Sequence, residues 1–197
     1  DSVISGIVAL VGPPNAGKST LLNCLLKQKI SIVTPKPQTT RNRIAGIINE
    51  KDYQIVFLDT PGLHKSEAPL NRELLKIAME SLRNVDGVVF MLDVSRARPE
   101  KSREKEERDL AEYFHEITAP ALLVLNKVDL VQRTELLPLI ESYASLYPFR
   151  AIMPISALTG EGTEHLVTEL LSILPRGFLY FPEDIPTDAT ERFLVSE

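Results

Sequence analysis

Cysteine is nearly absent from this chain of 197 residues, in which Cys24 is the only one. A single thiol excludes an internal disulfide framework and any zinc site built from cysteines. The chain also lacks an apolar run near the ~18 residues of a membrane-spanning helix, internal repeats, low-complexity segments and a basic-then-apolar signal pattern at its start. These absences favour a globular protein of the cytoplasm. Because the chain begins at Asp1 and not at methionine, we expect a piece of a longer protein.

The composition is that of an ordinary globular protein, with 44% apolar and 25% charged residues. The length suits one domain or slightly more. A formal net charge of −5 argues against a nucleic-acid-binding surface over the whole domain. Basic residues dominate residues 1–49, and acidic residues dominate residues 161–197. Two interpretations remain open: solvated faces, or a basic N-terminal part that binds a ligand with several negative charges.

Short runs rich in valine and isoleucine alternate with helical patterns, which predicts an α/β fold. Only Glu50–Asp52 separates two of the runs, so that pair must form an antiparallel hairpin. We therefore expect a mostly parallel six-stranded sheet with one antiparallel hairpin and helices on both faces, and ligands beyond the carboxyl ends of the strands. The predicted strands are Ile7–Val11, Arg43–Asn49, Tyr53–Asp59, Val88–Asp93, Ala121–Asn126 and Ala151–Ile155, and the predicted helices are Lys18–Leu26, Leu70–Leu82, Lys101–His115, Glu135–Leu146 and Thr163–Leu174.

A phosphate-binding loop is the strongest motif in the sequence. The predicted strand Ile7–Val11 runs into Gly12–Ser19, which reads G-x-x-x-x-G-K-[ST], and a predicted helix follows. In this context the backbone amides and the helix N-terminus bind the β-phosphate, Lys18 reaches the β- and γ-phosphates, and the Ser19 hydroxyl binds Mg²⁺. The motif predicts a nucleoside-triphosphate site, whose expected contact residues here are Asn15, Ala16, Gly17, Lys18, Ser19 and Thr20.

A second motif, D-x-x-G, spans Asp59–Gly62 at the end of a predicted strand. Asp59 is expected to hold Mg²⁺ through a water molecule, and the Gly62 amide is expected to contact the γ-phosphate. Acid-then-glycine turns are common at strand ends, so the motif gains its meaning from its place one hairpin after the phosphate loop.

The third motif, Asn126–Asp129, follows another predicted strand and indicates that the base is guanine. A carboxylate only accepts hydrogen bonds, so Asp129 suits a base edge with two donors, which guanine has and adenine lacks. Asn126 is expected to tie the neighbouring loops together and to contact N7, and the Lys127 stem is expected to lie over the base. The alternative interpretation is an N-cap turn between a strand and a helix. A fourth segment follows the last predicted strand and is expected to offer the amide of its middle residue to guanine O6: Ser156, Ala157 and Leu158.

These four motifs, in this order and spacing, resemble those of the translation-factor-type GTPases. The stretches G-P-P-N-A-G-K-S-T, P-K-P-Q-T-T-R and D-T-P-G-L-H, with F-P-E-D and T-D near the C-terminus, resemble the Era family of bacterial ribosome-assembly GTPases. Related tRNA-modification and double-domain GTPases share the motifs but not the C-terminal stretches. The resemblance implies a P-loop GTPase fold that binds GTP, GDP and Mg²⁺, hydrolyses GTP slowly and acts as a switch in assembly of the small ribosomal subunit.

The resemblance also implies roles for two loops. Gln38–Asn42 corresponds to the first switch, in which Thr40, or alternatively Thr39, coordinates Mg²⁺ when GTP is bound, and Asp59–Pro69 corresponds to the second switch. The expected catalytic residues are then Lys18, Thr40, Gly62 and Asn15, and the expected metal ligands are Ser19, Thr40 and Asp59.

Leu63 departs from Ras-like GTPases, which place a water-positioning glutamine after this glycine. Leucine neither donates nor accepts a hydrogen bond, so intrinsic hydrolysis should be slow and activation should come from elsewhere. Neighbouring His64 is interpreted as an ordinary loop residue. Asn15 has two open interpretations: similar GTPases use an asparagine here to hold a potassium ion in place of an arginine finger, or its side chain fixes the loop through an Asx-type hydrogen bond.

Two regions are expected: a GTP-binding domain over 1–176, and over 177–197 a linker with the truncated start of a KH-type RNA-binding domain. Thr187 and Asp188 are an N-cap signal for a helix predicted over Ala189–Glu197. The resemblance implies that the absent KH domain binds 16S rRNA of the small ribosomal subunit. It also implies a cytoplasmic protein with some peripheral contact with the inner membrane, and we expect a monomer.

Two other functions stay open from the sequence. A guanine-nucleotide sensor, whose turnover is incidental, would also fit Leu63. A phosphotransferase acting on a small molecule is disfavoured, because no segment resembles a substrate lid and Asn126–Asp129 already explains the base.

Overall fold

The computed structural model describes residues 2–13, 15–28, 31–32, 43–59, 82–95, 111, 114–115 and 117–181. Several predictions lie wholly or largely outside these residues. They are the first switch loop, the second switch loop after Asp59, and the helices predicted over Leu70–Leu82, Lys101–His115 and Ala189–Glu197.

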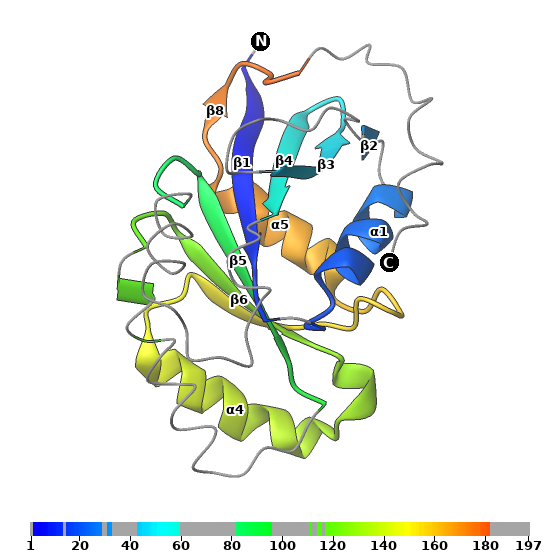
Figure 1. Cartoon of the computed structure of the whole chain (residues 1–197), viewed down its shortest axis with the longest axis vertical. Helices are drawn as coiled ribbons and strands as arrows, with labels where there is room; N and C mark the ends of the chain where they lie inside the picture. The colour runs from blue at the N-terminus through cyan, green and yellow to red at the C-terminus, as the bar shows by residue number, and fades with distance from the viewer. Residues whose placement is uncertain are drawn as a thin grey trace.

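An eight-stranded sheet forms the centre of the described part of the chain, in the order β2-β3-β4-β1-β5-β6-β7, with β8 paired to β1 (Figure 1). Strands β4, β1, β5, β6 and β7 are parallel, and β3 pairs antiparallel with β4. The predicted α/β class is confirmed, and two short antiparallel strands, β2 and β8, add to the six that were expected. The bounds are Val3–Val11 for β1, Ser31–Ile32 for β2, Arg43–Asn49 for β3, Tyr53–Asp59 for β4, Gly87–Asp93 for β5, Ala121–Asn126 for β6, Ala151–Pro154 for β7 and Arg176–Gly177 for β8.

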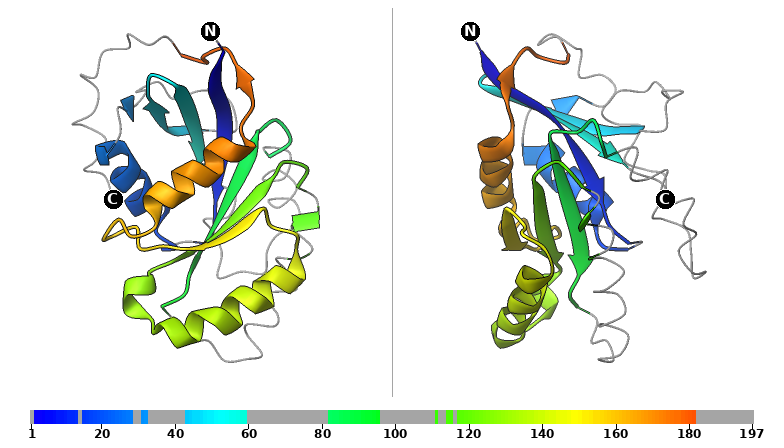
Figure 2. Two further views of the ribbon diagram at one scale, coloured as in Figure 1. Left: turned by 180° about the vertical axis from the view of Figure 1, so that it is seen from behind. Right: turned by 90° about the vertical axis from the view of Figure 1, so that its left-hand side faces the viewer.

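Side-chain packing places helices on both faces of the sheet, and Figure 2 shows one of them, coloured orange, running across the strands. α1 (Lys18–Gln28) and α5 (Thr163–Ile173) pack on one face, and α4 (Arg133–Leu146) packs on the opposite face beside β6 and β7. The strand period of two distributes the core between the faces: Val8 and Leu10 pack on the α1 and α5 side, and Ala9 and Val11 on the other. Burial on both sides explains why these strands lack a polar alternation.

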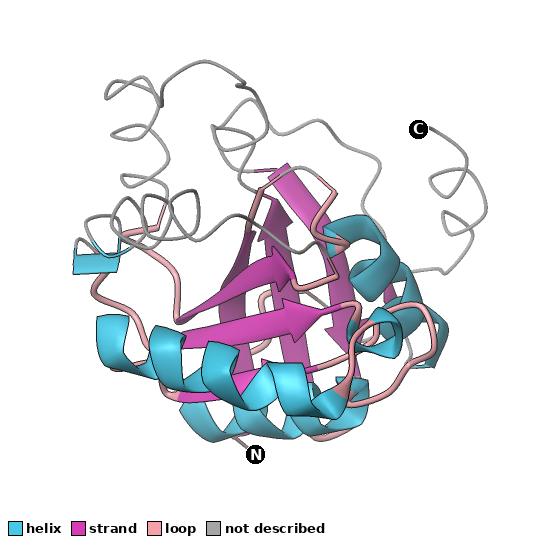
Figure 3. Cartoon of the chain, turned by 90° about the horizontal axis from the view of Figure 1, so that it is seen from below, coloured by secondary structure: helices cyan, strands magenta, loops and turns pink. Residues whose placement is uncertain are grey.

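The sheet brings the predicted motifs to one edge. Because β1, β4, β5, β6 and β7 are parallel, their carboxyl ends and the loops that follow them meet there. Leu10 is in register with Asp59, and Asp93 is in register with Asn126. Figure 3 shows the twisted sheet and the helices packed against it. Within the described ranges, no helix combines the length and the apolar character that crossing a bilayer requires.

Candidate nucleotide-binding site

Glycine is required at two positions of the loop between β1 and α1. A Cβ atom on Gly12 would lie 2.5 Å from the backbone oxygen of Met91, and one on Gly17 would lie 2.1 Å from Nδ2 of Asn126. Gly17 also has a φ of +101°, in the region that other residues rarely adopt. Asn15 has a positive φ as well, 63°. The loop is therefore closely fitted against β5 and against the end of β6.

Lys18 begins α1 and folds back over this loop. Its Nζ donates to the carbonyl of Gly12 at 2.6 Å and to that of Pro13 at 3.3 Å. Burial lowers the pKa of Lys18 to about 8, although attraction to the Asp59 carboxylate acts in the opposite direction. The ammonium group is thus poorly hydrated and lies within the electrostatic reach of Asp59, at the end of β4.

The first turn of α1 presents an open helix N-terminus. It contains no acidic residue, and both Ser19 and Thr20 are exposed to solvent, whereas Ala16 is buried. The amide of Leu21 already donates to the carbonyl of Gly17 at 2.9 Å. The first amides of a helix have no hydrogen-bond partner within the helix itself, and a helix start of this kind attracts anions.

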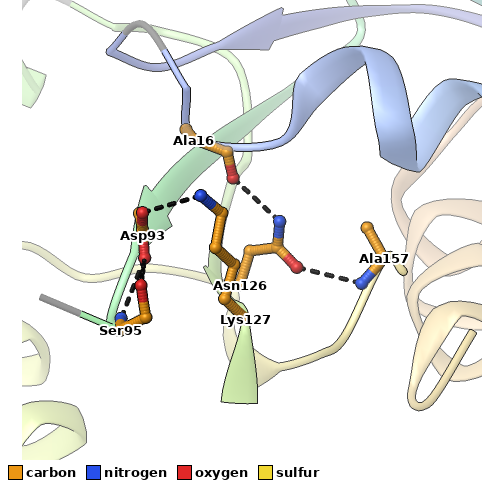
Figure 4. A network of polar contacts seen from close by, with 6 residues as sticks. All are labelled: Ala16, Asp93, Ser95, Asn126, Lys127 and Ala157. Atoms are coloured by element: carbon orange, nitrogen blue, oxygen red, sulfur yellow. Dashed lines mark hydrogen bonds and ion pairs between the residues drawn. The ribbon is translucent and has the colours of Figure 1, made fainter. Parts of the chain in front are cut away.

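Asn126 joins three loops through its side chain (Figure 4). Its Nδ2 donates to the carbonyl of Ala16 at 2.8 Å, and its Oδ1 accepts the amide N–H of Ala157 at 2.9 Å. Only 2% of Asn126 is exposed. The link between loops that the sequence predicted for this residue is therefore present. The Ala157 amide, which was expected to donate to guanine O6, donates here to Asn126.

Ser156–Leu158 forms a tight turn after β7. The hydroxyl of Ser156 is buried and accepts the amide of Thr159 at 3.2 Å, and the carbonyl of Ser156 accepts the amide of Gly160 at 2.8 Å. Ala157 is buried as well, whereas Leu158 is 79% exposed. The turn therefore holds its middle amide beside Asn126 and directs Leu158 to solvent.

A short 3-10 helix, η2 (Val128–Leu130), follows β6. Lys127 precedes this helix and Asp129 lies within it. Lys127 has left-handed backbone angles, with φ 70° and ψ 35°, and its side chain pairs with Asp93 at 2.8 Å. Asp129 is exposed at the start of η2. Lys127, a residue of this motif, is the N-cap residue of η2, although its side chain makes no hydrogen bond to that helix, and Gln132 is the N-cap residue of α4. The alternative interpretation, an N-cap turn between a strand and a helix, therefore stays open beside the base-reading role.

Sequence reasoning missed Asp93, the last residue of β5, and Ser95 just beyond it, which bond to each other. Their signal was an acidic residue at the carboxyl end of a strand beside β6. Two of the predicted site residues, Thr40 and Gly62, lie outside the described residues.

A glycine-rich loop between a strand and a helix, with Lys18, Ser19 and the Asn126 junction at the carboxyl edge of a parallel sheet, defines a P-loop nucleotide-binding domain. A family model described as 50S ribosome-binding GTPase matches residues 7–127. The chain belongs to this family.

Similar proteins and solved structures point to one group of GTPases within this family, Era. The GTPase Era of Geotalea uraniireducens is 48% identical over 193 residues, which are 98% of this chain and 63% of that protein. A variant of Aquifex aeolicus Era bound to GDP and AlF4⁻ has a TM-score of 0.70 and 40% identity, over 94% of this chain and 62% of that one. Era in complex with MgGDPNP and nucleotides 1506–1542 of 16S ribosomal RNA has a TM-score of 0.69 and 38% identity, over 93% and 61%. The resemblance to Era is confirmed, and the chain spans less than two thirds of the length of these relatives.

Proposed function

We propose that this domain binds GTP and hydrolyses it to GDP and phosphate, and that the two nucleotide states act as a switch in assembly of the small ribosomal subunit. The main observation behind the proposal is the pair of hydrogen bonds from the Asn126 side chain, the Asn126 junction. It links the phosphate loop to the two loops proposed to bind the base, Asn126–Asp129 and Ser156–Leu158. Ligands of such α/β sheets bind at this edge. The Era structures with bound guanine nucleotides, one of them with a 16S rRNA fragment, support the same function.

The phosphates would bind the loop amides, the start of α1 and Lys18. Burial disfavours the charged form of Lys18 and lowers its pKa, and the negative charge of a bound phosphate would stabilise that charged form. Guanine would be read by Asp129, which accepts from N1–H and N2–H₂, while the Lys127 stem covers the face of the base. The Ala157 amide, which Asn126 holds in place, would also contact O6.

The available oxygen atoms fit Mg²⁺. This ion is usually held by one or two protein groups together with substrate phosphates and water molecules. The exposed hydroxyl of Ser19 and the carboxylate of Asp59, whose charge acts on Lys18, provide such a set, and Thr40 would add a third oxygen. When bound, Mg²⁺ would neutralise charge on the phosphates.

Hydrolysis would rest on Lys18, on the Gly62 amide and on Thr40, with no glutamine at Leu63 to orient water. Two roles stay open for Asn15: a potassium site or an Asx-type bond within the loop. Hydrolysis rates at matched ionic strength in potassium and in sodium separate them. Only a potassium site predicts stimulation that Asn15→Ala abolishes.

The finer parts of the proposal come from the Era resemblance. The domain would occupy 1–176, and 177–197 would lead to a KH domain that binds 16S rRNA. The protein would be a cytoplasmic monomer with some peripheral contact with the inner membrane. Leu63 also fits a second candidate function, a guanine-nucleotide sensor in which GTP hydrolysis is incidental. Single-turnover rates with and without small ribosomal subunits test this, because only a GTPase switch should be accelerated by them.

Base choice provides the sharpest test of the binding site. Asp129→Asn should weaken GDP and GTP binding and improve binding of xanthosine nucleotides, whose C2 carries an oxygen acceptor. Affinities are measured by titration with fluorescent nucleotides, with ATP as the reference that the unchanged protein should reject. An unaltered preference for guanine in the variant would mean that Asp129 does not read the base.

A further inference from the structure

A carboxylate outside the recognised motifs lies beside the proposed base loop. Asp93 ends β5 in register with Asn126 at the end of β6, and the Val94 amide donates to the Asn126 carbonyl at 3.1 Å. Beyond this last backbone bond, Oδ2 of Asp93 accepts from Nζ of Lys127 at 2.8 Å (Figure 4). The ion pair therefore extends the β5–β6 pairing into the loop that carries Lys127.

The carboxylate of Asp93 is held in one orientation. Its other oxygen, Oδ1, accepts both the amide N–H of Ser95 at 2.8 Å and the Ser95 hydroxyl. Its side chain is 8% exposed, against 32% for Lys127. Burial raises the pKa of Asp93, but the hydrogen bonds from Lys127 and Ser95 outweigh it and keep the pKa below its ordinary value. Asp93 is thus a fixed negative charge at neutral pH.

Lys127 is held at both ends. Its backbone has the left-handed angles that residues other than glycine adopt rarely, and the next amide, of Val128, donates to the carbonyl of Ile155 at 3.2 Å. Its ammonium group is held by Asp93. The methylene stem between these two ends consequently has little freedom, although a lysine side chain normally has much to lose.

We propose that Asp93 is a positioning residue of the guanine site, which holds the stem of Lys127 where it covers the face of the base. This inference rests on the proposed function. Asp93 does not touch the nucleotide and acts through Lys127. Its contribution is preorganisation, because the side chain is ordered before the nucleotide binds and less entropy is lost on binding.

The test compares release of a fluorescent GDP analogue, in excess GDP, from the full chain and from Asp93→Asn, which keeps the shape and removes the charge. Release should become about tenfold faster, as expected when a half-buried charge pair is lost. In a Lys127→Met background the same substitution should have no further effect. The matched control is Asp86→Asn, one residue before β5, where the carboxylate accepts the Ile7 amide at 2.8 Å. That variant should lower the melting temperature without accelerating release.

A base analogue separates the roles of the two carboxylates. Inosine diphosphate lacks the N2 amino group that Asp129 is proposed to bind, but it has a similar face. Asp93→Asn should therefore accelerate release of both diphosphates equally, whereas Asp129→Asn should affect GDP more. Unchanged release in Asp93→Asn, or equal acceleration with and without Lys127, would overturn the positioning role. Failure of the unchanged protein to bind GDP would instead refute the proposed function and, with it, this role.

Discussion

Removing the Asn126 side chain should uncouple the loops of the site and destabilise the protein. Asn126→Ala deletes two hydrogen bonds, to the carbonyl of Ala16 and from the amide of Ala157. Both Ala16 and Ala157 are buried, so water cannot easily replace the lost partner. An unsatisfied buried group costs about 1–3 kcal/mol, so two of them predict a loss of about 2–6 kcal/mol. Such a loss is a large part of a typical domain stability of about 5–15 kcal/mol.

Urea unfolding followed by circular dichroism, with and without GDP, measures the change. The midpoint should fall at constant slope, and the added stability that GDP gives the unchanged protein should be lost. Asn49→Ala is a matched control, because Asn49 is also buried and accepts from Gln54 Nε2 at 3.0 Å at the opposite end of β4. It should lower the midpoint but keep the GDP effect. A loss below about 1 kcal/mol for Asn126→Ala would show that the junction is not the main link between the loops.

Two further predictions follow from single residues. The pKa of Lys18, lowered by burial to about 8, predicts that GDP affinity falls as the pH rises through 8, whereas Lys18→Arg should show no such step because its guanidinium does not titrate there. Without nucleotide, the expected effect of pH on stability has the opposite sign. Lys18 of the unfolded chain keeps its proton up to about pH 10.5, whereas Lys18 of the folded chain loses it near pH 8. The free energy of unfolding, measured in urea relative to Lys18→Arg, should therefore rise between about pH 8 and 10.5. The Gln54 side chain donates to the Phe181 carbonyl at 3.1 Å and accepts the amides of Tyr180 and Phe181 at 3.0 and 3.1 Å. Gln54→Leu should therefore expose residues 176–181 to proteases with GDP affinity unchanged, and an unaltered cleavage pattern would mean that the Gln54 bonds do not hold this segment.

The sequence predicted those parts of the fold that depend on local pattern. The bounds of β3 and β4 match the prediction residue for residue, because both strands are apolar and a three-residue turn leaves only one way to connect them. Strand β8 could not be predicted, since its two residues are exposed or half-buried and are held only by pairing with Val3 and Ile4. Pairing with β4 as well as with β8 explains why β1 begins before Ile7, through Ser5 and Gly6, which carry no hydropathy signal.

For the candidate site, sequence reasoning singled out residues of contiguous motifs and missed those that depend on strand order. Asn126 was predicted to join loops, and both of its partners lie in segments that the motifs had already marked. Asp93 belongs to no motif, and its meaning comes from β5 lying beside β6, an adjacency that spacing along the chain does not reveal. Knowledge of the strand order alone would have placed an acidic residue next to Lys127.

In the phosphate loop, hydrogen bonds to carbonyl groups fix the orientation of the peptide units and so the direction of their amide N–H groups. Three carbonyls of this loop accept from side chains: those of Gly12 and Pro13 accept from Lys18, and that of Ala16 accepts from Asn126. The peptide units of the first two end on proline nitrogens, which carry no hydrogen, so these units offer no amide that could compete for an anion. The Ala16–Gly17 unit is different, because none of the described peptide bonds is cis and a trans peptide directs its N–H opposite to its C=O. Since Asn126 fixes that carbonyl on one side, the Gly17 amide must face the other, which is the side where we propose that phosphate binds.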